Sequence, residues 1–197
     1  MRELATIARH AGTVLAGQLA VMAFGVTDTI VAGRYSSEAL AALSVASAVF
    51  VSVYVSLMGV LQALLPIWAE QHGRGDTTAI GASFRQSLYL ALGFTLLGML
   101  VLVFPDPILA WTEVPAAMQA DVRAYLIIVG WALPSAMFFR LYTTLNQALG
   151  HPQLVTWLQV GALVLKVPLS IWFTFGGWGI GAQGAAGCAW ATLLVDY

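Results

Sequence analysis

The chain has 197 residues, of which 60% are hydrophobic and only 9% are charged, with a formal net charge of −1. A soluble domain carries roughly 25% charged residues, so this composition excludes a surface that faces mainly water and indicates surroundings made largely of membrane lipid. The single cysteine excludes an internal disulfide framework and any multi-cysteine metal site. The sequence has no basic run that would favour a nucleic-acid partner.

Long apolar runs separated by short polar breaks predict an all-α, polytopic membrane helix bundle. Because a helix rises about 1.5 Å per residue, a hydrocarbon core of about 30 Å needs roughly 20 apolar residues. Five runs reach this length and a sixth has about half of it, which predicts about six transmembrane helices with the sixth incomplete. The predicted spans are residues 11–32, 40–69, 83–104, 123–149, 154–175 and 184–197.

The second predicted span carries no charge and is longer than a crossing requires, so we expect it to tilt or protrude. Pro66 near its end predicts a helix bend. Small residues recur along this span at helical spacing, a pattern that lets helices approach closely and predicts packing against a neighbour. They are Ala48, Ser52, Ser56, Gly59 and Ala63. The acidic, proline-containing segment 105–121 is expected to be an interfacial linker.

Arginines in the loops favour a cytoplasmic N-terminus. The location that we expect is a bacterial-type inner (plasma) membrane. Four arginines precede the first span or lie between the second and third, whereas two lie in the alternate loops. A cleavable signal peptide over residues 1–41 is the alternative, since the basic start, the apolar core and the small residues near its end resemble one. The length of the first apolar run and the spans that follow favour a membrane helix.

Lys166 lies near the centre of the fifth span, where a charge costs about 2.5–3.5 kcal/mol on insertion scales. Its stem reaches only about 6 Å, too short to bring the ammonium to water. We therefore expect it to face a hydrated cavity or a carboxylate. Helical spacing places Gln159, Lys166 and Ser170 on one face, opposite Trp157. The alternative is a lysine that only binds neighbouring carbonyls.

Asp28 is the only acidic residue within the first five spans and shares a helical face with Gln18. With the predicted orientation, Asp28 and Lys166 both lie in or near the outer half of the membrane, so we expect that they can meet. A carboxylate that gains and loses a proton there, or holds a cation, is a component of a coupled transporter. A static ion pair that fixes helix register is the alternative.

Arg140 in the fourth span shares a face with several polar residues and is interpreted either as lining a cavity or as an interfacial anchor. Pro168, two residues after Lys166, predicts a second helix bend. The three histidines lie at span ends or in loops, and no hydrolase or phosphate-loop motif appears. We predict no enzyme, no catalytic residue, no metal site and no cofactor.

Four stretches together resemble the multidrug and toxic compound extrusion (MATE) family of efflux transporters. They are VTDTIVAGR, LLPIWAEQHGRGD, AYLIIVGWALPSAMFFR and GHPQLVTWLQVGALVLKVPLSIWFTFGGWGIGAQGAAGCAWAT. The resemblance implies half of a twelve-helix protein whose two lobes open alternately to either side of the membrane. It implies exchange of an amphipathic, drug-like and often cationic substrate for protons or sodium ions. This chain resembles the N-terminal lobe, so a C-terminal lobe is the expected partner.

The resemblance places Asp28 at the family's coupling aspartate. Where many members have two asparagines in an N-x-P-L-N pattern, this sequence has KVPLS, with Lys166 and Ser170 instead. The ammonium of Lys166 would occupy the region where a metal cation would otherwise sit. H⁺ is therefore the favoured coupling ion, and Na⁺ is the alternative. Two other functions are alternatives: a lipid or lipid-linked-sugar flippase of similar architecture, and a non-transporting membrane subunit.

Overall fold

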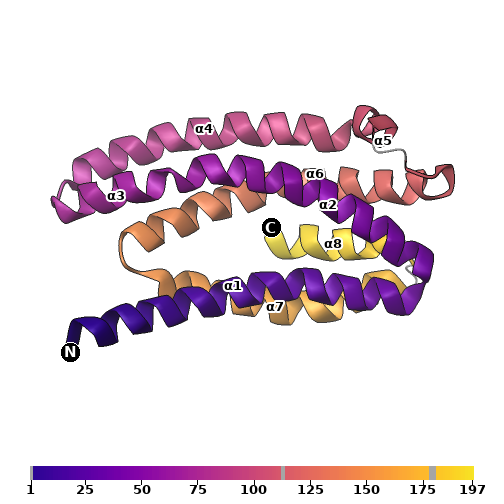
Figure 1. Ribbon diagram of the computed structural model, residues 1–197, viewed down its shortest axis with the longest axis horizontal. Helices are drawn as coiled ribbons and strands as arrows, with labels where there is room; N and C mark the ends of the chain where they lie inside the picture. Colours follow the sequence, from indigo (N-terminus) through magenta and orange to yellow (C-terminus); the bar gives the residue numbers. More distant parts are fainter. Residues whose placement is uncertain (1, 112–113, 178–180) are drawn as a thin grey trace.

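The structure, a computed structural model, describes residues 2–111, 114–177 and 181–197, with the backbone alone for residues 2–10. The described part of the chain forms eight helices (Figure 1). In chain order they are α1 (Arg2–Tyr35), α2 (Ser37–Gln62), α3 (Leu64–Gly73), α4 (Thr77–Val103), α5 (Asp106–Trp111), α6 (Ala116–Ala148), α7 (Pro152–Phe175) and α8 (Ala185–Asp196).

Five segments of the described chain are long and apolar enough to cross a membrane. They are Ala11–Tyr35, Ser37–Gly73, Thr77–Val103, Ala116–Ala148 and Pro152–Phe175. Helix α8 is also apolar but has only 12 residues, fewer than a crossing needs. The predicted all-α membrane bundle, with an incomplete sixth span, is therefore confirmed.

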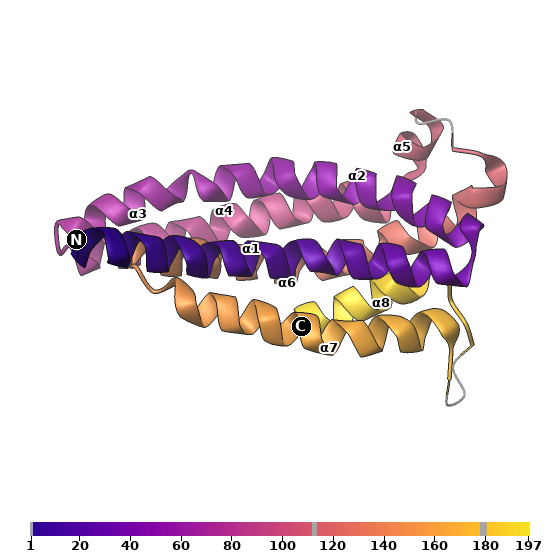
Figure 2. The same ribbon diagram turned by 60° about the horizontal axis from the view of Figure 1, so that its bottom comes forward.

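The helices form two layers with α8 between them. In Figure 1, α2, α3 and α4 lie in the upper layer, and α1 and α7 lie in the lower one. Helix α1 packs along α7, while α6 contacts α2, α4 and α8. Figure 2, turned by 60°, keeps α7 and α8 together on one side of α1. This arrangement places the fifth and sixth spans directly beside the first.

The apolar core lies between α2, α4 and α6. Leu61, Leu102 and Leu133, one from each of these helices, are fully buried there. Helix α3 is fastened to α4 by Trp68, whose buried indole Nε1 donates to Ser83 Oγ at 3.0 Å. The upper layer is thus held mainly by close-packed aliphatic side chains.

The second predicted span, residues 40–69, lies within the apolar segment Ser37–Gly73, which is divided into two helices. Helix α2 stops at Gln62, the chain turns at Ala63, and α3 continues to Gly73. Pro66 gives a physical reason, because a proline ring clashes with the carbonyl four residues earlier, here that of Gln62, and has no N–H to donate. The break therefore lies just before the proline rather than at it.

The small residues of the second span do not pack inside the described lobe, so their packing against a neighbouring helix stays a prediction. All five are exposed, whereas Ala42, Ala46, Leu57 and Leu61 form the buried face of α2. Positions that differ by two residues are about 200° apart on a helix. The small-residue face therefore points away from the core, because the larger aliphatic face makes the contact with α6.

The fourth span begins earlier than the predicted boundary at residue 123. Helix α6 starts at Ala116, directly after Pro115, and the Gln119 side-chain amide donates to the Val114 carbonyl at 2.9 Å. Asp121 and Arg123 are exposed, so their charges do not stop the helix.

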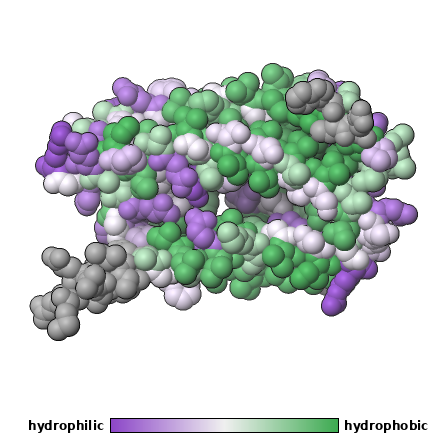
Figure 3. All heavy atoms as spheres, viewed as in Figure 1, coloured by the Kyte–Doolittle hydropathy of each residue, from purple (hydrophilic) through white to green (hydrophobic). Residues whose placement is uncertain are grey.

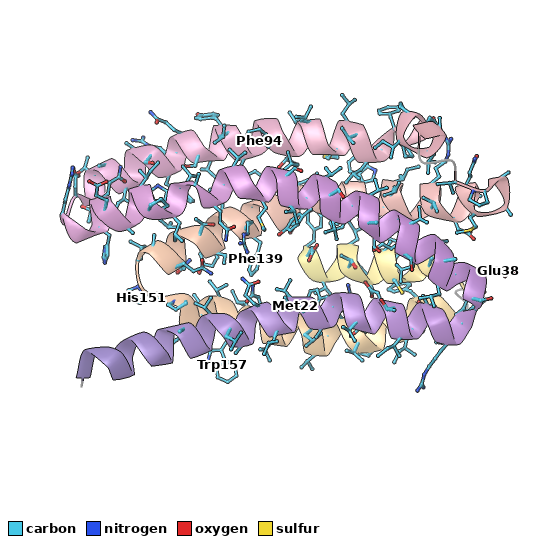
Figure 4. All side chains as sticks on the ribbon, viewed as in Figure 1. Met22, Glu38, Phe94, Phe139, His151 and Trp157 are labelled. Atoms are coloured by element: carbon cyan, nitrogen blue, oxygen red, sulfur yellow. The ribbon has the colours of Figure 1, made fainter. Side chains whose placement is uncertain are left out.

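The outer surface of the bundle is apolar. Figure 3 shows hydrophobic residues over most of the visible face, with a hollow between the two layers that has hydrophilic residues at its margin. Met22, Tyr89 and Trp157 are 68%, 78% and 73% exposed. Trp157 projects outward from the lower layer in Figure 4. Such a surface fits contact with lipid chains rather than water.

Candidate functional site

The two intramembrane charges singled out in the sequence meet in the lower layer. Lys166 of α7 and Asp28 of α1 are 2% and 6% exposed, and Lys166 Nζ donates to Asp28 Oδ2 at 2.9 Å. Ser170, one turn after the lysine, donates to the other carboxylate oxygen, Oδ1, at 3.3 Å. Both oxygens of the carboxylate therefore have a donor from the same helix, which offsets part of the cost of removing it from water.

Lys166 also binds the sixth helix. Its Nζ donates to Thr192 Oγ1 of α8 at 2.8 Å and lies 4.8 Å from the centre of the Phe24 ring of α1. An ammonium over an aromatic face gains electrostatic stabilisation, more so away from water. The lysine thus contacts α1 and α8 at once while its own backbone belongs to α7.

A close approach of α8 to α7 makes this contact possible. Gly187 has no room for a side chain, because a Cβ there would lie 2.6 Å from the backbone of Phe173. The buried thiol of Cys188 lies 3.4 Å from Thr174 Oγ1 and 3.9 Å from the Asp28 carbonyl oxygen. Thr192 in turn donates to the Cys188 carbonyl at 3.0 Å. The polar cluster therefore involves three helices.

Residues of α8 were missed by reasoning from the sequence. Thr192 lies four residues after Cys188 and four before Asp196, so the three share one helical face. The backbone carbonyl of Asp196 accepts a hydrogen bond from Ser135 Oγ of α6, and its carboxylate interacts electrostatically with Lys166. The polar residues in the short sixth apolar run were the signal in the sequence that could have identified them.

The two glutamines lie along the same pair of helices but away from the ion pair. Gln159 is 8% exposed and lies against Gly17 of α1, where a Cβ would be 2.4 Å from its Oε1. It precedes Lys166 by two helical turns, about 10 Å along the axis. Gln18 is half-buried, ten residues before Asp28. The predicted polar face of α7 is buried as expected, but only Lys166 and Ser170 touch the carboxylate.

The remaining predicted residues lie elsewhere. Arg140 of α6 is 9% exposed and its Nε is fully buried, and its two interpretations, a cavity-lining residue or an interfacial anchor, stay predictions. Helix α7 continues through Pro168 to Phe175, and Pro66 lies in the first turn of α3. Among the described residues there is no group of three histidine, cysteine or acidic side chains that could hold a metal ion.

Comparison with known proteins gives one consistent family. The family model MatE matches residues 14–172. A probable multidrug resistance protein NorM from Aromatoleum aromaticum is 35% identical over 188 residues, which are 95% of this chain and 41% of the relative. Multidrug resistance protein PmpM from Pseudomonas aeruginosa is 30% identical over an alignment that covers 98% of this chain and 40% of PmpM. The chain thus spans about two fifths of the length of these relatives.

Two solved structures resemble the chain. The MATE transporter NorM-NG, solved in complex with rhodamine 6G and a monobody, is 30% identical with a TM-score of 0.62 and covers 92% of this chain and 40% of its own. A MOP superfamily transporter from Pyrococcus furiosus has a TM-score of 0.86 at 18% identity and covers 97% of this chain and 42% of its own. The second likeness concerns the fold alone.

Proposed function

The chain belongs to the MatE family, and from that premise we propose that it forms the N-terminal six-helix lobe of a multidrug efflux transporter driven by inward proton movement. The expected substrates are drug-like, often cationic molecules, and the C-terminal lobe supplies the other half of their path. The N-terminus is proposed to lie in the cytoplasm, on the basis of the arginine distribution.

The observation that carries the proposal is the buried pair of Asp28 and Lys166, 2.9 Å apart. A carboxylate held in a membrane bundle is a site where a proton can bind and leave. Its ionic partner among the described residues is Lys166, so protonation of Asp28 removes the principal charge that Lys166 faces on α1. The bond from Lys166 to Thr192 of α8 does not depend on that proton.

This asymmetry suggests how protonation moves helices. When Asp28 is neutral, the ion-pair attraction between α1 and α7 is lost, whereas α7 and α8 stay joined through Lys166 and Thr192. Helix α1 is then free to shift against the α7–α8 unit, and the lobe adopts a state that releases substrate outward. Loss of the proton toward the cytoplasm restores the pair and resets the lobe.

Protons are favoured over sodium because the ammonium of Lys166 already occupies one oxygen of the carboxylate. A sodium ion at Asp28 would lie beside that positive charge and would have to displace it. Lys166→Asn removes the competing charge and supplies an amide oxygen. We therefore expect this variant to show sodium-stimulated efflux, and Lys166→Met, which offers no oxygen, to serve as its control.

The proposal is tested with the full-length protein that contains this chain, in everted vesicles energised by a proton gradient. Asp28→Asn is expected to reduce rhodamine 6G transport to the level of vesicles without the protein, while equilibrium binding of the dye persists. Asp121→Asn makes the same chemical change at an exposed site and should transport normally. Undiminished transport by Asp28→Asn would discard the scheme, and absence of transport by the unmodified protein would favour the flippase or the non-transporting subunit.

A further inference from the structure

Arg140 is a second buried cation, and the proposed coupling does not use it. It is 9% exposed and lies on α6, eight residues before the helix ends at Ala148, about 12 Å along the axis. Its Nε is buried without a hydrogen-bond partner among the described residues. No described carboxylate lies within 4 Å of it, whereas Arg74 and Arg123 both form ion pairs and are largely exposed.

An arginine in this situation requires an acceptor. Its guanidinium stays protonated under all ordinary conditions and presents five N–H donors in a planar fork. Burial of even one of these N–H groups, here that of Nε, without a partner is unfavourable, because the hydration that it loses is not replaced. The fork matches carboxylate, sulfonate and phosphate groups, which accept two parallel hydrogen bonds from it.

Neighbouring polar groups on α6 do not fill this role. Thr143 donates to the Phe139 carbonyl at 2.8 Å and Thr144 to the Arg140 carbonyl at 2.9 Å, so both hydroxyls satisfy their own helix. Asn146 likewise donates to the Tyr142 carbonyl at 2.9 Å. None of these three side chains is directed at the guanidinium by a described bond.

Helix α6, which carries Arg140, runs from the upper layer toward the lower one (Figure 1). Helix α6 contacts both α2 and α8, and Arg140 is buried on it. Figure 4 shows Phe139, its neighbour, in the gap between α6 and α1. The same region is the hollow with a hydrophilic margin in Figure 3.

From these observations we infer that Arg140 forms a subsite for an anionic group, namely a carboxylate, sulfonate or phosphate carried by an amphipathic molecule. This inference rests on the proposal that the chain is half of a drug transporter. It adds recognition of an anionic group to the recognition expected for cationic substrates. Along the helices, Arg140 lies nearer the α6–α7 turn than the Asp28–Lys166 pair does. The acidic group comes either from the substrate or from a lipid headgroup.

Two dyes that differ in one charge test this subsite. Rhodamine 6G is an ethyl ester, and its hydrolysed free acid has the same ring system with a carboxylate. Binding of each to the purified full-length protein in neutral phosphatidylcholine nanodiscs is followed by fluorescence anisotropy, which requires no ion gradient. Arg140→Gln is expected to raise the dissociation constant of the free acid about tenfold or more, the value of a charge-assisted hydrogen bond, and to leave that of the ester unchanged.

Two variants and one lipid control complete the test. Arg140→Lys keeps the charge but not the fork and should give an intermediate effect, whereas Arg85→Gln, at an exposed site, should change neither dye. If phosphatidylglycerol in the nanodisc weakens binding of the free acid only when Arg140 is present, the lipid headgroup competes for the same subsite. If only the soluble acid binds, the substrate supplies the group.

The inference is overturned if Arg140→Gln weakens both dyes equally or neither. It is also overturned if Arg140→Met markedly lowers the thermal unfolding temperature, because that result would indicate that an acidic residue elsewhere in the protein already pairs with the arginine. Selective weakening of the free acid by Arg140→Gln, without gradient-driven transport by the unmodified protein, would support the subsite and reject the proposed coupling, so the two failures are distinguishable.

Discussion

The two buried cations of this lobe, Lys166 and Arg140, lie in opposite environments. Lys166 has a carboxylate, a hydroxyl and an aromatic face around it, supplied by α1 and α8. Arg140 has an Nε without an acceptor and no described carboxylate in ion-pair range. The first charge is balanced inside the described chain, so its removal should disturb the fold. The second is not, so its removal should disturb binding and leave the fold intact.

Removal of Lys166 is expected to have the largest effect on stability. Lys166→Met leaves the Asp28 carboxylate buried without its cation, which typically costs about 3–5 kcal/mol. Thermal and detergent unfolding of the full-length protein at pH 8 measures this loss. The double variant Asp28→Asn/Lys166→Met should recover most of it, because no charge is then left unpaired. Equal stability of the single variant and the unmodified protein would contradict a structural ion pair.

Removal of the α8 acceptor is expected to have the next largest effect. Thr192→Val keeps the shape of the side chain but takes one hydrogen bond from the ammonium, with a loss of about 1.5–3 kcal/mol. The same substitution at the exposed Thr29, whose hydroxyl donates only to the Gly25 carbonyl of its own helix, is the control. A similar effect at both positions in the unfolding measurement would mean that α8 does not share the lysine.

The approach of α8 to α7 can be tested at a single atom. In Gly187→Ala the added Cβ meets the Phe173 backbone at 2.6 Å, and overpacking of this kind costs about 1–3 kcal/mol. At Gly161 of α7 a Cβ would meet nothing within 4 Å, so Gly161→Ala should be neutral or stabilise the helix by about 1 kcal/mol. If both alanines stabilise the protein, the two helices are not in close contact.

The smallest effect on stability is expected at Arg140. Replacement of an unpaired buried charge by an apolar side chain of similar length removes a desolvation penalty, so Arg140→Met should unfold at the same or a higher temperature. The difference in unfolding temperature between this variant and Lys166→Met is the most direct test of the contrast between the two regions. A loss comparable to that of Lys166→Met would abolish the distinction between them.

Local sequence features were sufficient for part of this site. The stem of Lys166 is too short to reach water from the middle of a span, and helical spacing puts Ser170 on the same face. Only one acidic residue was available within the first five spans. These facts led to the pairing with Asp28 without any knowledge of how the helices pack.

Other features depended on contacts between distant segments. Thr192 can bind Lys166 because Gly187 lets α8 approach α7 closely. The small residues of α2 point outward because the opposite face of that helix contacts α6. The break at Ala63 lies three residues before Pro66, where the sequence predicts a helix bend, and is a local effect of the proline.

The sequence by itself determined that this chain is a bundle of membrane helices and that its buried lysine needs a carboxylate, because hydropathy, side-chain length and helical period are properties of single segments. The tertiary structure alone decided which buried charge has an ionic partner among the described residues and which has none. Such a partnership requires that side chains more than a hundred positions apart in the sequence come within hydrogen-bond distance. Whether they do depends on how the helices pack, and therefore on the shapes of all the surfaces that meet.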